Sequence, residues 1–209
     1  YAKQLVYSHA IQQFKLLSLW QKQSLLCEQD VEVFKARIKN MIPMIAASHN
    51  MEQLRGLEGA TAKVIFACIA SIAPVWCKFK GRNRRPPLDP INVVLSLSYS
   101  LIYAECTRAL TAQALDPMLG FYHEPVHGRY SLACDLTERI RTEIDKWVLQ
   151  LFIEEHLKIN HFSSSEQYPC VLNKEGRAIF YPLWERKFKA WKKYLRSNAQ
   201  QWAKTVDQA

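Results

Sequence analysis

The sequence lacks an uncharged apolar run long enough to cross a membrane. Its uncharged stretch at 64–77 is 14 residues long and is interrupted by Ser71 and Pro74, whereas a membrane-spanning helix needs about 20 apolar residues. We therefore expect a soluble protein without a membrane partner.

The sequence also lacks a C-x-x-C pair among its six cysteines, which lie at irregular spacings. This pattern predicts ordinary buried thiols in a reducing compartment. An initiator methionine and a basic-then-apolar leader are missing too, and a helical pattern is already under way at Tyr1. These absences predict a fragment of a longer chain.

Acidic residues are fewer than basic ones, with 19 Asp and Glu against 28 Lys and Arg, for a net charge of +9. Such a surplus favours partners rich in phosphate or acidic groups. Hydrophobic residues make up 49% of the 209 positions, which is enough for a sizeable core and argues against extended disorder.

Apolar residues recur at helical spacing along most of the chain. The pattern predicts helices at about 1–26, 31–41, 51–73, 90–111, 132–151 and 183–206. Asn50, with Gln53 three residues later, predicts a capped start for the third helix, and Asp89 before Pro90 predicts the start of the fourth. The segment 160–182 is irregular, and Gly176 is expected in a turn between two short extended pieces. The predicted fold is therefore all-α: one helical domain of about six helices, with a short irregular or hairpin segment before the last helix.

Glu58 is unusual because it shares the inward-facing stripe of the third helix with apolar residues such as Leu54 and Ile65. An unpaired carboxylate in that position is costly, and each neighbouring glycine costs about 1 kcal/mol relative to alanine inside a helix. Two interpretations stay open: tight helix packing with Glu58 paired to an arginine, or a functional carboxylate.

Residues 123–127 match the H-E-x-x-H pattern of zinc proteases, in which two histidines one helical turn apart bind one metal ion. Pro125 lies between the two histidines, and Gly120 and Gly128 flank them, so a regular helix is not expected and we treat the match as chance. A single histidine in this loop is still a candidate metal ligand, although a lone surface histidine more often has no such role.

Asp135 and Glu138 are three residues apart, so on a helix their carboxylates point to one side and can share a site. The same spacing is typical of a capping box, in which acidic residues complement the helix dipole. The local sequence leaves both interpretations open.

Two groups of basic residues are candidates for contacts with phosphate groups, although such residues can also be merely solvated. The first is a loop with Lys78, Lys80, Arg82, Arg84 and Arg85, and the second is the polar face of the last helix, with Lys189, Lys193 and Arg196. The aromatic face of that helix, which includes Trp184 and Trp191, is expected in the core.

Four motifs follow one another along the chain: R-G-L-E-G at 55–59, R-R-P-P-L-D-P-I-N at 84–92, L-D-P at 115–117 followed by G-F-Y-H at 120–123, and D-L-T-E at 135–138. In this order and spacing the chain resembles the CRISPR-associated spacer integrase family from about residue 54 to residue 141. The resemblance implies that residues 1–209 form the helical catalytic domain of this family, and that the family's small N-terminal β-domain is absent.

In that family a metal site is made by the Glu of the first motif, the His after G-F and the acid that closes the last motif. The resemblance therefore implies that Glu58, His123 and Glu138 are catalytic and bind the metal, with Asp135 as a supporting or additional ligand. Oxygen ligands with one imidazole suit Mg²⁺ or Mn²⁺.

The resemblance implies a prokaryotic, cytoplasmic enzyme of antiviral defence. This enzyme is a metal-dependent DNA endonuclease and integrase that joins the 3′-hydroxyl ends of short foreign DNA fragments to a CRISPR repeat by transesterification. Implied partners are DNA, a second copy of the chain, a small second adaptation protein and, in some relatives, a fused upstream domain such as a reverse transcriptase. Two alternatives stay open: a non-catalytic helical DNA-binding module, and a related integrase of transposon ends.

Overall fold

The computed structural model describes residues 1–165 and 168–206. Over these residues the chain forms α1 (Ala2–Lys22), α2 (Glu28–Ala47), α3 (Met51–Ile72), α4 (Pro90–Thr111), α5 (Ser131–Glu138), α6 (Arg141–Ile153), the strands β1 (Phe162–Ser163) and β2 (Val171–Leu172), and α7 (Lys174–Val206). The prediction of an all-α fold with a short hairpin before the last helix is confirmed. Within the described ranges, every helix is too short or too polar to cross a membrane.

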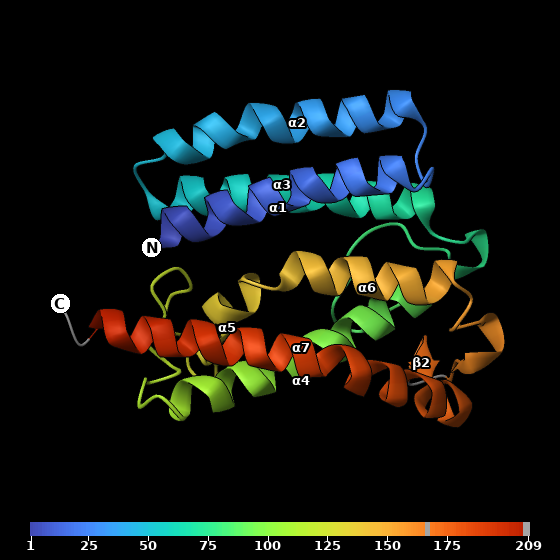
Figure 1. Ribbon diagram of the computed structural model, residues 1–209. Helices are drawn as coiled ribbons and strands as arrows, with labels where there is room; N and C mark the ends of the chain where they lie inside the picture. The colour runs from blue at the N-terminus through green and yellow to red at the C-terminus, as the bar shows by residue number, and fades with distance from the viewer. Residues whose placement is uncertain (166–167, 207–209) are drawn as a thin grey trace.

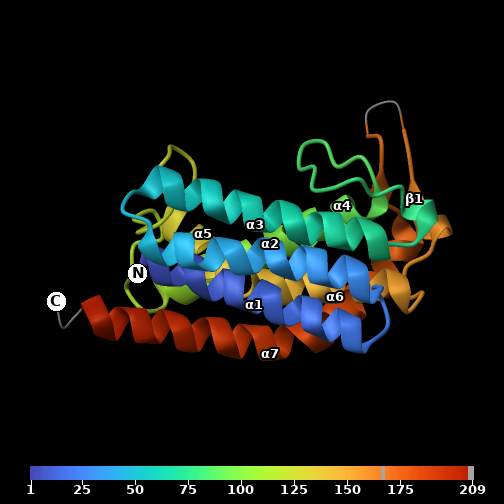
Figure 2. The ribbon, with the colours of Figure 1, turned by 90° about the horizontal axis from the view of Figure 1, so that it is seen from above.

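The helices form two layers (Figure 1). Helices α1, α2 and α3 pack together in one layer, and α4 to α7 form the other, which α1 contacts through α5 and α6. Seen from above, both termini and the loop between α4 and α5 lie at one end, whereas the loop between α3 and α4 and the hairpin lie at the opposite end (Figure 2).

The two predicted helix starts that rest on capping signals are confirmed. The Asn50 side chain accepts a hydrogen bond from the backbone N–H of Gln53 at 2.7 Å, and α3 begins at the next residue. The Asp89 carboxylate accepts the backbone N–H of Asn92 at 2.9 Å, and Pro90 is the first residue of α4. A side-chain oxygen in this place satisfies a donor that has no partner within the helix.

The last helix begins nine residues earlier than predicted, at Lys174 rather than 183. Gly176 lies in its first turn, so the prediction of a turn at this glycine is wrong; the two extended pieces are β1 and β2, which pair antiparallel before it. Pro182 lies inside α7 but is exposed, and Phe180 and Trp184 on either side of it are buried. Packing of these rings holds the helix together where the proline removes a backbone donor.

The predicted single helix at about 132–151 is wrong, because the chain forms α5 and α6 with a break at Arg139 and Ile140. Neither glycine nor proline marks this break. It is held from outside, since the Arg139 Nε donates to the Asn198 side-chain oxygen of α7 at 3.1 Å. Two other helix ends differ from the prediction: α1 ends at Lys22 rather than at about residue 26, and α2 extends to Ala47 rather than ending at about residue 41.

The expectation that the aromatic face of the last helix is core is confirmed. Trp147 of α6 packs against Trp184 and Trp191 of α7, with ring centroids 5.6 Å apart in each pair. Both α7 rings are buried, at 4% and 5% exposure.

The cysteines are free thiols, as predicted, but they are not all buried. Four are buried, and Cys134 is partly exposed. Cys27 is exposed and caps α2, where its sulfur accepts the backbone N–H of Asp30 at 3.4 Å.

Gly176 brings α7 against the hairpin, and this close approach can be tested. An added Cβ would lie 2.5 Å from the His161 carbonyl oxygen and 2.6 Å from Leu172 Cδ1. We expect Gly176→Ala to lower the free energy of unfolding by about 1–3 kcal/mol through overpacking. Gly56→Ala is the control, because a Cβ there meets nothing within 4 Å and should raise stability by up to about 1 kcal/mol. Denaturant unfolding measures both, and equal effects would contradict the close approach.

Candidate active site

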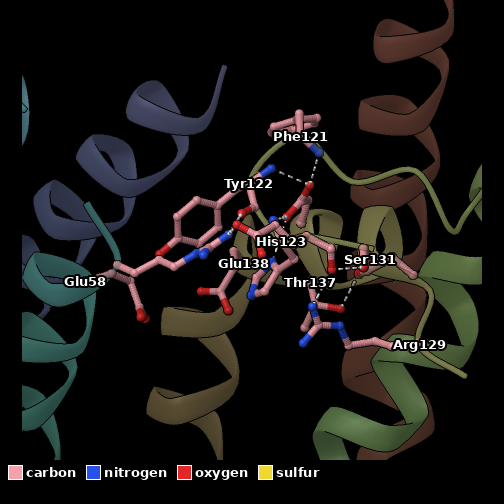
Figure 3. Close-up of polar contacts among 12 residues, drawn as sticks. Glu58, Phe121, Tyr122, His123, Arg129, Ser131, Thr137 and Glu138 are labelled. Atoms are coloured by element: carbon pink, nitrogen blue, oxygen red, sulfur yellow. Dashed lines mark hydrogen bonds and ion pairs between the residues drawn. The ribbon is translucent and has the colours of Figure 1, made fainter. Parts of the chain in front are cut away.

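Two carboxylates from different layers meet beside one arginine. Glu58 comes from the middle of α3 and Glu138 from the end of α5, immediately before the break (Figure 3). Arg141, the first residue of α6, places Nη1 2.6 Å from the Glu138 Oε1 and 3.4 Å from the Glu58 Oε1. Glu58 therefore has the arginine partner that one interpretation of the sequence required, and it also shares a site with a second acid.

A third residue, His9 of α1, joins this pair. Donor atoms of His9, Glu58 and Glu138 all lie within 4.8 Å of one another, and no other such group is found among the described residues. His9 is buried, and its Nδ1 lies 3.5 Å from the Glu138 Oε2. The sequence analysis missed His9. The available signal was a pair of polar residues, His9 and Gln13, one turn apart on a buried helix stripe.

Asp135 holds the loop that carries His123. Its Oδ2 accepts the backbone N–H groups of Phe121 at 2.8 Å and Tyr122 at 3.1 Å, and its Oδ1 accepts that of His123 at 3.0 Å (Figure 3). The same Oδ1 lies 2.6 Å from the His123 Nδ1. Because a carboxylate only accepts, Nδ1 carries the proton and the lone pair of Nε2 stays available. Asp135 is thus placed to support the site, with both oxygens already engaged.

The electrostatics of the site follow from burying like charges together. Burial raises the pKa of Glu58, and the charge of Glu138 adds to this effect, while Arg141 opposes it. Burial would also raise the pKa of Glu138, but the positive charge of Arg141 is the main opposing influence, and this pKa is lowered. Burial lowers the pKa of His9 to about 4, which leaves its imidazole neutral at neutral pH.

These residues fit a divalent cation. The Glu138 Oε2 is buried and has no hydrogen-bond partner among the described residues, which is costly for a carboxylate oxygen unless something positive binds it. Carboxylate oxygens with an imidazole form a donor set suited to Mg²⁺ or Mn²⁺.

The basic loop between α3 and α4 presents four of its five cations to solvent: Lys78, Lys80, Arg84 and Arg85. Arg82 turns inward. It donates to the Asn92 side-chain oxygen at 2.9 Å and to the Ser96 hydroxyl at 3.1 Å. We therefore place Arg82 as a support of the loop.

On α7, Lys189 and Lys193 are exposed. Arg196 is engaged within the fold, because its Nε lies 3.2 Å from the Oε1 of Glu105 on α4. Glu105 is fully buried and also pairs with Arg108 at 2.9 Å. The two arginines compensate a buried charge, and Arg196 joins α7 to α4.

A second polar cluster lies between the basic loop and the site. The Tyr99 hydroxyl of α4 donates to the Asp145 carboxylate of α6. The guanidinium groups of Arg82 and Arg141 lie over the same Tyr99 ring, 5.6 and 5.7 Å from its centroid. Burial raises the pKa of Asp145 to about 6. No local sequence pattern indicates this cluster, because its members are far apart in the chain.

The sequence matches the family model described as CRISPR associated protein Cas1 over residues 1–186. The chain belongs to the Cas1 family.

Curated relatives agree with this assignment. "CRISPR-associated endonuclease Cas1 1" of Thermodesulfovibrio yellowstonii is 36% identical over 99% of this chain and 65% of its own length. "CRISPR-associated endonuclease Cas1 3" of Thermus thermophilus is 39% identical over 71% of this chain and 45% of its own length. The chain thus spans less than two thirds of the Cas1 relatives it matches.

Solved structures share the fold. The "Partial Cas6-RT-Cas1--Cas2 complex" superposes with a TM-score of 0.87 at 24% identity, covering 99% of this chain and 64% of that one. "Casposase bound to integration product" superposes with a TM-score of 0.76 at 21% identity, covering 97% of this chain and 60% of that one.

The role of Asp135 as the anchor of the His123 loop can be tested with Asp135→Asn. An amide would present N–H groups to backbone donors, so we expect the free energy of unfolding to fall by about 2–3 kcal/mol. Amide exchange at residues 121–123 should accelerate. Asp116→Asn is the control, because that exposed carboxylate accepts one backbone N–H, from Met118 at 2.9 Å. A comparable loss in both variants would show that Asp135 holds no more than a surface turn.

Proposed function

We propose that this chain is the helical catalytic domain of a metal-dependent DNA endonuclease and integrase of CRISPR adaptation. Its reaction joins the 3′-hydroxyl ends of short foreign DNA fragments to the repeat of a CRISPR array. The observation that carries the proposal is the meeting of Glu58 and Glu138, 80 residues apart in sequence, with a buried Glu138 oxygen that has no hydrogen-bond partner among the described residues.

The reaction is an exchange of phosphodiester bonds. The oxygen of a DNA 3′-hydroxyl forms a bond to the target phosphorus and gives up its proton to solvent. The bond to the target strand's 3′-oxygen breaks, and this oxygen takes up a proton and leaves as a new 3′-hydroxyl. Endonuclease action is the same exchange with water as the attacking group. A divalent cation supplies positive charge beside the phosphate and makes the attacking hydroxyl more acidic.

The protein groups have separate tasks in this proposal. Glu58, Glu138 and the Nε2 of His123 hold the cation, and Mg²⁺ or Mn²⁺ suits these donors. Asp135 fixes the His123 tautomer and the backbone of its loop. Arg141 keeps the two glutamates in place by pairing with an oxygen of each.

The exposed cations of the basic loop and of α7 bind the DNA backbone in this proposal. Sequence-independent contacts of this kind need charges that are free to reach phosphate. Lys78, Lys80, Arg84 and Arg85 meet that condition on the loop, and Lys189 and Lys193 meet it on α7.

We also propose that the protein acts in the prokaryotic cytoplasm as a homodimer with the small second adaptation protein. The structural neighbour titled "Cas6-RT-Cas1--Cas2 complex" supports Cas2 as that partner and a reverse transcriptase as a fused domain; it superposes with a TM-score of 0.85 at 25% identity. The relatives named as CRISPR-associated endonucleases support the nuclease activity.

The catalytic role of the glutamates can be tested with Glu58→Gln and Glu138→Gln in the full-length protein. Loss of a carboxylate ligand should reduce metal-dependent strand transfer and cleavage of branched DNA by at least about 100-fold, since metal charge stabilises the transition state by several kcal/mol. DNA affinity should not weaken. Gel assays with Mn²⁺, Mg²⁺ or EDTA measure the activity, and filter binding measures the affinity.

Glu52→Gln is the matched control, because Glu52 is an exposed acid in the first turn of the same helix. It should keep full activity. Strand transfer that survives Glu58→Gln would refute the proposed site. Salt-sensitive DNA binding without metal-dependent chemistry in the unmodified protein would favour the non-catalytic module instead.

The basic loop makes a separate prediction about salt. We expect that replacing its four exposed cations by alanine will make the slope of log affinity against log salt concentration less steep by roughly 3–4 units. The reason is that each cation that neutralises one phosphate contributes about 0.9 to this slope. The control is a double replacement of Arg37 and Lys39, exposed cations of α2, and should change the slope little. An unchanged slope in the loop variant would remove the loop from the DNA path.

A further inference from the structure

We propose that His9 is a fourth metal-ligating side chain, acting through Nδ1, so that the cation is held by two carboxylates and two imidazoles. This inference rests on the metal site proposed above and adds a residue from α1, a helix outside the four motifs that carry the family resemblance. It begins from the only group of three donor residues within 4.8 Å among the described residues, which contains His9 rather than His123.

The first argument is the spacing between His9 and Glu138. Nδ1 and Oε2 lie 3.5 Å apart, and this pair forms no hydrogen bond, because Oε2 has no partner among the described residues. Two ligands of one metal ion, with bonds of about 2.1 Å at about 90–110°, stand roughly 3.0–3.5 Å apart. The separation therefore suits two donors that face a shared cation.

The second argument is the direction in which the free carboxylate oxygen points. In both glutamates it is Oε1 that faces Arg141. In Glu138 this leaves Oε2, the buried oxygen without a partner, on the side of His9. A cation at this point would satisfy the oxygen and lie beside a neutral imidazole, the form that binds metals.

The third argument is the residue behind His9. A histidine that ligates through Nδ1 carries its proton on Nε2 and normally donates it to a neighbouring acceptor. The Gln13 amide lies 3.2 Å from the His9 Nε2, one helical turn away, and is almost completely buried. The Gln13 Oε1 has no partner among the described residues, and turning the amide by half a rotation brings this oxygen to the His9 Nε2–H.

A second imidazole changes which metal the site prefers. Mg²⁺ favours oxygen ligands and keeps much of its water, whereas Mn²⁺, a first-row transition metal, accepts nitrogen ligands more readily. With His9 and His123 both bound, the site should select Mn²⁺ over Mg²⁺ more strongly than a site with one histidine.

The experiment is pulsed EPR of Mn²⁺ bound to the full-length protein, which counts the imidazole nitrogens coupled to the metal. We expect two coupled imidazoles in the unmodified protein and one in His123→Asn. One coupling that disappears completely in His123→Asn overturns the proposal. This comparison does not require a His9 variant to fold.

The direct test of His9 as a ligand is the variant His9→Asn. It should lower the count to one and raise the Kd for Mn²⁺ by about tenfold to hundredfold, with a smaller change in the Kd for Mg²⁺. The control is His49→Asn, at an exposed position, which should keep two couplings and the original Kd. A His9→Asn protein that folds, keeps both couplings and binds Mn²⁺ unchanged overturns the proposal.

The same measurement separates this inference from the function on which it rests. Glu58→Gln should weaken Mn²⁺ binding whether or not His9 is a ligand. Unchanged Mn²⁺ binding in Glu58→Gln would refute the metal site itself, whereas weakened binding together with a single coupling from His123 would refute only the role of His9.

Discussion

The structure depends on two carboxylates that meet between its two helical layers: Glu138, which is buried, and Glu58, whose side chain is 18% exposed. Like charges out of water repel one another and lose hydration, so they persist only with close compensation. Arg141 supplies one positive charge for two negative ones. Glu138 is the last residue of α5 and Arg141 the first of α6, so this ion pair spans the break between the two helices. The remaining negative charge is what suits the site to a cation.

The loop between α4 and α5 shows how an irregular segment can be held rigidly without helix or sheet. Its only strand-like pairing in the described chain is a single bridge between Val126 and Arg129. Residues 121–123 are held by one buried carboxylate, Asp135, which accepts three consecutive backbone N–H groups and the His123 ring proton. Preorganising a donor in this way removes the ordering cost that binding would otherwise carry.

The sequence predicted the fold class, and it predicted helix starts wherever a local side chain makes the decision, as Asn50 and Asp89 do. It failed where distant residues decide. The break at Arg139 is held by α7, and α7 runs through Pro182 because buried rings on both sides outweigh one lost backbone bond. Local patterns left Glu58, a histidine at 123–127, Asp135 and Glu138 as open candidates, and only the family resemblance favoured their functional roles. No periodicity could pair His9 with an acid 129 residues later.

The residues of the site come from both helical layers, and this affects when the site forms as the chain folds. His9 lies on α1 and Glu58 on α3. Glu138 lies just before the break between α5 and α6, where Arg139 is bound by Asn198 of α7. Contacts between residues so far apart in sequence form late in folding. Closing a long loop costs conformational entropy, which must be offset by other contacts first. A nascent or half-folded chain therefore lacks the assembled group of His9, Glu58 and Glu138. In the function proposed above, any chemistry at these carboxylates waits until the final helix docks.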